Sequence, residues 1–209
     1  MSEPDWLAWT REMQAIAQTG IAFVKDPYDR ERYDMLRDLA SRIMAAHTGT
    51  APERIDALFA GETGYATPKI DVRGAAFDAQ GRILMVREVM DSGRWTLPGG
   101  WADVNLTAAE NVVKEMREES GFEVRATKLA ACWDRARQGH GVFAFSTLKL
   151  FYLCEITGGS ASASLETSEV AFFAEHELPD DLSTGRVLRH QLIRMFEHMR
   201  NRNLPTDFD

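Results

Sequence analysis

Apolar residues in the first 66 positions recur at the three- and four-residue spacing of α-helices, and no alternating strand interrupts them. Leu7, Met13, Ile16 and Ala17 recur at helical spacing and predict a first helix, and a short third helix is predicted between Pro52 and Gly61. The second predicted helix carries one apolar stripe, formed by Tyr33, Leu36, Leu39, Ala40, Ile43 and Met44. Three short helices bury little surface alone, so we expect this segment to pack on the rest of the chain or on a second subunit.

The pattern changes to strands after Pro68. Residues 69–77 alternate, a turn follows at 78–81, and residues 82–87 are predicted to return as the second strand of a hairpin. Further segments are predicted as strands or helix by the same patterns: strands at 124–134, 149–156 and 170–174, a turn at 158–160 between two of them, and a helix around 188–199. The order predicts an α+β fold of the α/β sandwich type, with a mixed sheet between helices. We expect two domains, residues 1–66 and 67–209.

A helix with a cluster of carboxylates follows the sequence Leu-Pro-Gly-Gly at 97–100. Thr107 and Glu110 have the spacing of a capping box, and Gly121 can close the helix, which predicts a helix over 108–120. At about 100° per residue, three glutamates then share one side: Glu115, Glu118 and Glu119. Glutamates at this spacing repel one another, and a divalent cation such as Mg²⁺ or Mn²⁺ would neutralise them. A Glu-rich helix end is by itself more often solvated surface, so the surrounding residues decide.

The stretch from Gly100 to Phe122 resembles the Nudix box, a signature built on one glycine, a glutamate cluster and a closing glycine. The positions in register are Gly100, Glu115, Met116, Glu118, Glu119, Gly121 and Phe122. Two positions depart from it, because Leu106 replaces a glutamate and Lys114 an arginine that brace each other in the family. A weaker brace between Glu110 and Lys114 could replace that pair, since the two stand four residues apart.

The resemblance implies a Nudix fold and a metal-dependent hydrolase of nucleoside diphosphates linked to another group. By position, Glu115 and Glu119 would be the principal Mg²⁺ or Mn²⁺ ligands, with Glu118 a third and the Gly100 carbonyl an extra one. Glu166 or Glu169, before a late strand, would supply a further catalytic carboxylate, although for either one an exposed surface position is as good an interpretation.

The rest of the chain resembles a bacterial Nudix subgroup described as ADP-ribose or CDP-choline pyrophosphatases. Its N-terminal helices pair two subunits, so we expect a homodimer formed through residues 1–66. Five residues in or beside strands and loops are candidates for substrate binding: Arg73, Arg87, Trp95, Arg135 and His140. For each of them an ion-paired, core or exposed-loop role is at least an equal alternative.

Composition limits the partners of the chain. A net charge of −8 lacks the basic surface that grips long nucleic acid, whereas a small anionic substrate can bind through divalent cations. No apolar run approaches the length of a membrane span and the N-terminus does not resemble a secretory signal, so we expect a cytoplasmic protein. Two alternatives to the hydrolase stay open: a Nudix domain that senses a nucleotide without cleaving it, and an RNA-processing enzyme with a basic patch near Arg135 and Arg137.

Overall fold

A computed structural model describes residues 3–209 and divides into two compact units. One unit contains the helices up to Lys69 together with the segment Val142–Ser146, and the other contains Ile70–Gly141 and Thr147–Asp209. No sequence pattern indicated that a short segment from the second half of the chain joins the helices. Within residues 3–209, none of the helices combines the length and the apolar character needed to cross a membrane.

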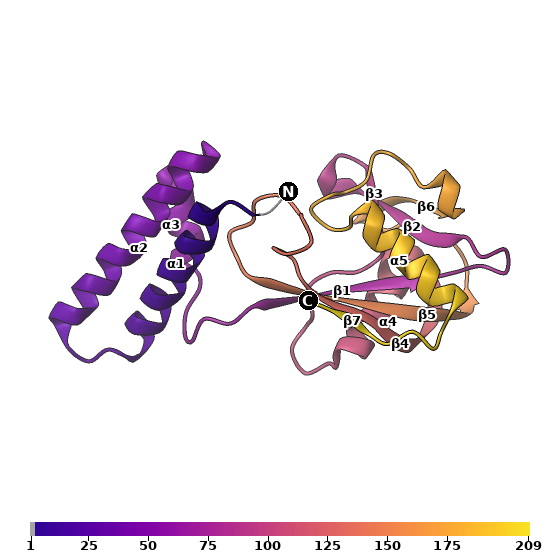
Figure 1. Cartoon of the computed structure of the whole chain (residues 1–209), viewed down its shortest axis with the longest axis horizontal. Helices are drawn as coiled ribbons and strands as arrows, with labels where there is room; N and C mark the ends of the chain where they lie inside the picture. The colour runs from indigo at the N-terminus through magenta and orange to yellow at the C-terminus, as the bar shows by residue number, and fades with distance from the viewer. Residues whose placement is uncertain (1–2) are drawn as a thin grey trace. The chain divides into compact units, whose positions relative to one another are not determined.

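The helical unit contains the three predicted helices, α1 (Asp5–Phe23), α2 (Pro27–Thr48) and α3 (Pro52–Ala60) (Figure 1). The Asp26 side chain caps α2 by accepting from the N–H groups of Tyr28 and Asp29. A Cβ on Gly20 of α1 would lie 2.4 Å from the ring of Tyr33 on α2, so the glycine permits close packing of the two helices. The small core of this unit consists of Leu7, Ala40, Met44, Ala45, Ile55 and Phe59.

The second unit holds two β-sheets (Figure 1). The four-stranded sheet has the order β1-β5-β4-β7 and contains β1 (Lys69–Ala76), β4 (Phe122–Asp134), β5 (Thr147–Gly159) and β7 (Asp207–Phe208). The three-stranded sheet has the order β3-β2-β6 and contains β2 (Ile83–Glu88), β3 (Arg94–Thr96) and β6 (Thr167–Phe173). Parallel pairing between β4 and β7 makes the first sheet mixed, as predicted.

Two predicted connections are wrong. β1 and β2 do not form a hairpin: they belong to different sheets, and a single bridge between Phe77 and Ile83 is the β-pairing that remains at the turn. Residues 158 and 159 are not a turn either, because β5 continues through them and Gly159 pairs with Phe122. The turn at 78–81 has formed, but in both cases long-range pairing decided which strands became partners.

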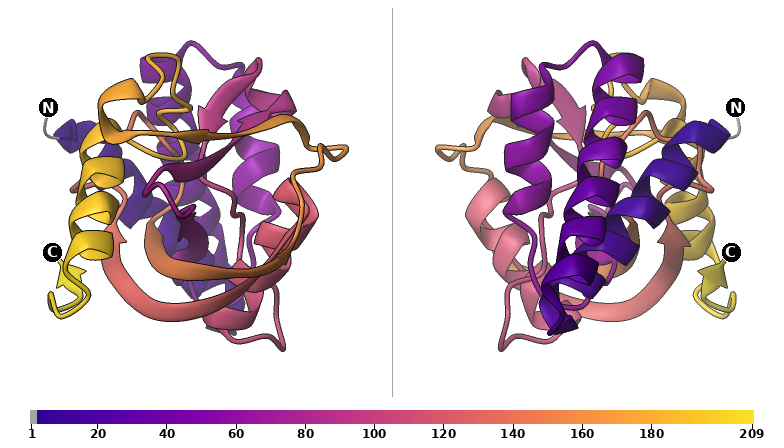
Figure 2. Two further views of the ribbon diagram at one scale, coloured as in Figure 1. Left: turned by 90° about the vertical axis from the view of Figure 1, so that its right-hand side faces the viewer. Right: turned by 90° about the vertical axis from the view of Figure 1, so that its left-hand side faces the viewer.

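Two long helices cover opposite sides of the sheets, α4 (Ala108–Ser120) and α5 (Arg189–Arg200) (Figure 2). Alternate residues of β1 and β2 face two separate cores. Val72 and Leu84 pack with Val112 and Met116 of α4. The residues that face the other way, among them Ala75, Ile83 and Met85, pack with Leu192, Met195 and Phe196 of α5. Cores on both faces explain why the last six residues of β1 and all but one residue of β2 are buried.

Short 3₁₀ turns complete the chain, η1 (Val89–Asp91) after β2 and η2 (Glu175–Glu177) after β6. The turn η1 follows Glu88, the last residue of β2, directly and carries Asp91.

Candidate active site

The segment that follows Pro98 runs antiparallel to β1 and brings two glycines beside α4. The Gly74 N–H donates to the Pro98 carbonyl at 2.9 Å, and the Val72 N–H donates to the Gly100 carbonyl at 2.8 Å. Gly99 has a φ of 145°, and a Cβ there would lie 2.0 Å from the Val72 carbonyl oxygen. Position 99 therefore requires glycine, and this close approach fixes the loop against the sheet.

Two glutamates of α4 extend toward these glycines. The carboxylate of Glu119, which is 4% exposed, accepts the Gly99 N–H at 2.8 Å. A Cβ on Gly100 would lie 3.0 Å from Oε2 of Glu115. Burial raises the pKa of Glu119 to about 7 and also raises the pKa of Glu115. Because burial disfavours the charged form of both, an added cation would stabilise this pair of carboxylates.

The third glutamate of the motif lies apart from this pair. The Glu118 side chain is 48% exposed and pairs with the Lys114 ammonium at 3.1 Å. Lys114 also lies 3.1 Å from Asp103 and 3.5 Å from Glu115. Within residues 3–209, no three Asp, Glu, His or Cys side chains come together closely enough to hold a metal ion. The assignment of Glu115, Glu118 and Glu119 as metal ligands therefore stays a prediction.

The expected brace between Glu110 and Lys114 is wrong. The predicted capping box has formed, and its geometry occupies the Glu110 carboxylate. Both the N–H and the hydroxyl of Thr107 donate to Glu110 Oε2 at 2.8 Å. The hydrogen bonds from Thr107 lower the pKa of Glu110. A glutamate that satisfies the first turn of its own helix is not free to hold a lysine one turn later.

Gly100 and Glu166 are the two other residues predicted to take part in the reaction. The Gly100 carbonyl, a predicted metal ligand, already accepts one hydrogen bond from Val72. Glu166 is exposed and stands directly before β6. The next residue, Thr167, donates its hydroxyl hydrogen to the Glu119 carbonyl at 2.6 Å, which joins the start of β6 to the end of α4. The catalytic role of Glu166 stays a prediction.

Arg73, predicted to bind phosphate, is part of a buried ion network. Its Nε and Nη2 donate to the two Asp71 oxygens at 2.9 and 2.7 Å, and its Nη1 donates to the Leu97 carbonyl. The buried Lys149 ammonium lies 2.7 Å from the same aspartate. Burial opposes ionisation of Asp71, but the charges of Arg73 and Lys149 outweigh it and lower the Asp71 pKa to about 2. These contacts connect β1 to β5. They also occupy the Arg73 guanidinium with partners inside the protein.

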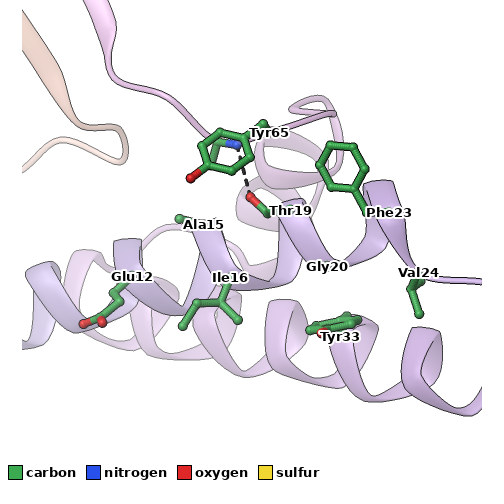
Figure 3. Close-up of a pocket in the computed structure, with 10 residues that line it drawn as sticks. Glu12, Ala15, Ile16, Thr19, Gly20, Phe23, Val24, Tyr33 and Tyr65 are labelled. Atoms are coloured by element: carbon green, nitrogen blue, oxygen red, sulfur yellow. Dashed lines mark hydrogen bonds between the residues drawn. The ribbon is translucent and has the colours of Figure 1, made fainter.

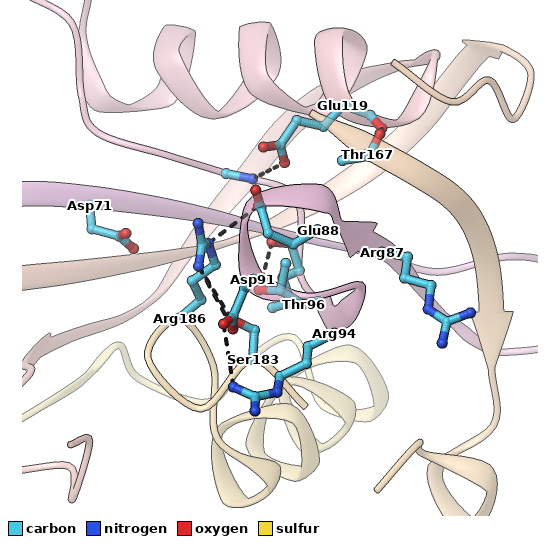
Figure 4. Close-up of polar contacts among 12 residues, drawn as sticks. Asp71, Arg87, Glu88, Asp91, Arg94, Thr96, Glu119, Thr167, Ser183 and Arg186 are labelled. Carbon is cyan, nitrogen blue, oxygen red and sulfur yellow. Dashed lines mark hydrogen bonds and ion pairs between the residues drawn. The ribbon is translucent and has the colours of Figure 1, made fainter. Parts of the chain in front are cut away.

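Arg87 and Trp95 lie on the neighbouring strands β2 and β3. Arg87 pairs with Glu169 at 3.3 Å and with Asp181 at 3.6 Å, and its guanidinium lies 5.7 Å from the centre of the Trp95 ring. Trp95 is buried and meets Phe173 edge to face at 4.8 Å, the contact of a core aromatic. Figure 4 shows Arg87 directed away from Glu119.

Arg135 and His140 also make contacts within the protein. Arg135 is buried and donates from Nη1 to the Gly141 carbonyl at 2.7 Å. His140 Nδ1 lies 2.7 Å from the Thr184 carbonyl and its Nε2 lies 3.3 Å from the Gln191 amide. Burial lowers the pKa of His140 to about 4, so the imidazole is neutral at physiological pH. A neutral ring that donates from Nδ1 and accepts at Nε2 satisfies both contacts.

A group that the sequence reasoning missed lies next to Glu119 (Figure 4). Glu88, at the end of β2, is 5% exposed, and Nε of Arg186 lies 3.3 Å from its carboxylate. Arg186 also approaches Asp91 at 3.9 Å, and the Ser183 hydroxyl donates to Asp91 at 2.6 Å. After burial and Glu115, the charge of Glu88 contributes to the raised pKa of Glu119. Glu88 could have been recognised from the sequence as a site residue, because a charged residue ends a largely apolar strand there. The residues around Arg186 give no such indication.

Two family models match the chain. Residues 67–193 match the model described as the NUDIX domain, and residues 4–59 match the model described as the UDP-X-like, N-terminal oligomerisation domain. The first match covers the glycine loop, α4 and the group around Glu88.

Relatives and solved structures agree with these models. The Bacillus subtilis protein named "Putative ADP-ribose pyrophosphatase YjhB" is 43% identical over 204 residues, which are 98% of this chain and 97% of that protein. The structure of an ADP-ribose pyrophosphatase from Streptococcus suis has 37% identity and a TM-score of 0.62 and covers 68% of this chain and 100% of that one. A UDP-X diphosphatase structure has 31% identity and a TM-score of 0.61 and covers 100% of both chains. The chain therefore belongs to the NUDIX family and is a Nudix hydrolase.

Proposed function

We propose that this Nudix hydrolase cleaves the pyrophosphate bond of a nucleoside-diphosphate derivative such as ADP-ribose or CDP-choline. The products would be a nucleoside monophosphate and a phosphorylated leaving group. The observation that carries the proposal is the pair of carboxylates packed against Gly99 and Gly100, of which Glu119 is buried and Glu115 partly buried. Relatives named ADP-ribose pyrophosphatase and UDP-X diphosphatase support a substrate of this class.

The donor set of the site fits Mg²⁺ or Mn²⁺, because all of its candidate ligands are oxygen atoms. Glu115 and Glu119 would be the principal ligands, since burial already disfavours their charged forms without a cation. Glu118 would join them after exchanging its contact with Lys114. A bound divalent ion would lower the pKa of a coordinated water and offset the charge on the phosphoryl oxygens.

Arg186 is the residue that we propose for binding the substrate's phosphate. Glu88 and Asp91 hold its Nε and Nη1, while Nη2 donates no hydrogen bond to any of residues 3–209. The Arg186 side chain is about one third exposed. A planar guanidinium with a free N–H edge suits phosphate oxygens. The five residues predicted from the sequence to bind substrate remain secondary proposals, because each is engaged in contacts within the protein: Arg73, Arg87, Trp95, Arg135 and His140.

Glu166 is the proposed general base. Its carboxylate is exposed, and its backbone is held in place, because its carbonyl accepts the Val89 N–H at 2.9 Å. The hydrogen bond from Thr167 to Glu119 keeps this turn beside the end of α4. An exposed carboxylate on a fixed turn can reorient toward a water molecule at the site.

A substrate panel tests the function. The purified chain would be incubated with Mg²⁺ or Mn²⁺ and ADP-ribose, CDP-choline or a UDP-sugar, with products identified by chromatography and ³¹P NMR. We expect a nucleoside monophosphate from at least one of them, and no product when the metal is chelated. Glu119→Gln should lower kcat by at least roughly a hundredfold, whereas Glu155→Gln, an exposed glutamate of β5, should not change it. Nucleotide binding without turnover on any substrate would contradict the proposal and favour a sensor.

We further propose that the chain forms a homodimer through its helical unit. Trp9, Ile16 and Phe23 of α1 are exposed and stand seven residues apart, so they form one stripe along the helix. Ile16 and Phe23 of this stripe line a groove of about 620 Å³ together with Tyr33 and Tyr65 (Figure 3). The match of residues 4–59 to an oligomerisation domain supports a second copy of the chain as the partner of this surface.

A further inference from the structure

One lysine holds three carboxylates at the proposed metal site. The Lys114 ammonium lies 3.1 Å from Glu118, 3.5 Å from Glu115 and 3.1 Å from Asp103. Glu115 and Glu118 belong to the glutamate cluster of α4, but Asp103 stands in the loop before the helix. Hydrogen bonds to Asp103 and then Glu118 raise the pKa of Lys114, so it stays charged at all physiological pH values.

The loop holds Asp103 in place through a buried side chain of α4. Asn111 is fully buried, and its Oδ1 accepts the Asp103 N–H at 2.8 Å. The Asn111 amide donates in return to the carbonyls of Asp103, Leu106 and Thr107. These bonds fix the backbone at position 103 relative to α4, so that the Asp103 carboxylate is presented to Lys114 with little loss of conformational entropy.

Positions 106 and 110 do not supply a further acid for Lys114. Leu106 has no charge, and the Glu110 carboxylate is occupied by Thr107. Leu106 and Lys114 line the same surface groove beside α4, so a carboxylate at position 106 could reach the lysine. Asp103, in the loop before α4, therefore provides the carboxylate partner for Lys114 that an acid at position 106 would provide.

We propose that Asp103 is a positioning residue that draws the Lys114 ammonium away from Glu115 and Glu118 so that these two carboxylates can take a divalent cation. This rests on the proposed function, because it assumes the metal site. Without Asp103, the Lys114 ammonium pairs only with Glu115 and Glu118. An incoming Mn²⁺ must then compete with the ammonium for these two carboxylates. With Asp103 present, Lys114 still has an ion-pair partner after Glu115 and Glu118 have bound the metal ion.

Mn²⁺ binding to the full chain, measured without substrate by the loss of the free-ion EPR signal, tests the proposal. Asp103→Asn should weaken Mn²⁺ binding roughly fivefold, which is the upper range for one exposed ion pair, and the effect should shrink at high salt. The Tm without metal should be unchanged, because the substitution keeps the backbone bonds between position 103 and Asn111. Asp180→Asn, which removes a fully exposed aspartate paired with Arg189, is the control for loss of one surface carboxylate and should change neither quantity.

Two second-site variants distinguish positioning of Lys114 by Asp103 from the mere loss of one negative charge near the metal site. Adding Leu106→Glu to Asp103→Asn should restore Mn²⁺ affinity to nearly that of the unaltered chain. In a Lys114→Met background, Asp103→Asn should have no further effect, since no ammonium is left to redirect. An unchanged affinity in Asp103→Asn, no rescue by Leu106→Glu, or the same loss in both backgrounds would each overturn the proposal. Failure of the unaltered chain to bind Mn²⁺ would instead overturn the metal site of the proposed function, and this proposal with it.

Discussion

Arg186 owes its position to two carboxylates rather than to its neighbours in sequence. Glu88 is buried at the end of β2, and the Arg186 guanidinium places a positive charge beside its carboxylate. Asp91, itself held by Ser183, limits the rotation of the same side chain. Nε and Nη1 of the Arg186 guanidinium are thereby held in place, and Nη2 is the group that we propose for binding an anion.

Replacing Arg186 should therefore weaken substrate binding more than it slows chemistry. We expect Arg186→Ala to raise KM roughly tenfold, the effect of losing about 1.4 kcal/mol of binding, and Arg186→Lys to recover only part of it because lysine lacks the planar fork. Arg125→Ala removes an exposed arginine of β4 and should leave KM unchanged. An Arg186→Ala variant with unaltered KM but a lowered Tm would indicate that the arginine only neutralises Glu88.

At the scale of elements, the glycine loop and α4 depend on each other. The loop approaches β1 so closely that position 99 has no room for a side chain, and its N–H then meets the Glu119 carboxylate. On the other side, Gly74 of β1 leaves space for Met116 of α4, whose sulfur would lie 2.4 Å from a Cβ at that position. Small residues on the strand and the loop thus set the distance between helix and sheet.

Gly99→Ala should disturb the site through the backbone. The added Cβ would collide with the Val72 carbonyl, so we expect the free energy of unfolding to fall by at least about 2 kcal/mol. Activity should fall with it, because Glu119 loses the N–H that orients it. Chemical denaturation and kcat would be compared with those of Gly141→Ala, where a Cβ meets nothing within 4 Å. Equal stability of both variants would show that the loop can move away from β1.

For the whole molecule, the network of Asp71, Arg73 and Lys149 links stability to pH. The folded-state pKa of Asp71 is lowered to about 2 from 3.8, so its contribution is present above pH 4 and is lost as the pH falls through 2. The shift corresponds to a contribution on the order of 2 kcal/mol. Burial lowers the pKa of Lys149 to about 8, so this group favours folding more as the pH rises from 8 toward 10.5.

Asp71→Asn should destabilise the protein at pH 7 by about 3 to 5 kcal/mol, because it leaves two buried cations without a carboxylate. The difference in unfolding free energy between this variant and the unaltered chain should narrow between pH 4 and pH 2. Urea denaturation across that pH range measures it, and Asp180→Asn, in an exposed pair, should show no such trend. A difference that stays constant with pH would contradict the lowered pKa.

The proposed dimer is tested by placing a charge on the apolar stripe of α1. Ile16→Glu should shift the sedimentation mass from twice 23.5 kDa to that of one chain, because a carboxylate would be buried in the interface. Leu165→Glu, an exposed leucine of the second unit, should keep the larger mass. A single-chain mass for the unaltered protein would exclude the homodimer.

Interactions within a few residues are what the sequence determined by itself. The bounds of α4, its capping box and its closing glycine all depend on groups three or four residues apart, and the local order of residues specifies those contacts. The three N-terminal helices and the side of α4 that carries the glutamates follow from the same short-range periodicity.

Contacts between residues far apart in the chain were decided by the tertiary structure alone. It separated β1 from β2, buried Arg73 and Trp95, and joined Glu88 to an arginine almost a hundred residues later. Lys114 pairs with Asp103 of the preceding loop as well as with Glu118 of its own helix, whereas Glu110 is held by Thr107. A local pattern states which residues are apolar or charged, but the choice of partner depends on the free energy of packing the whole chain, which no short window contains.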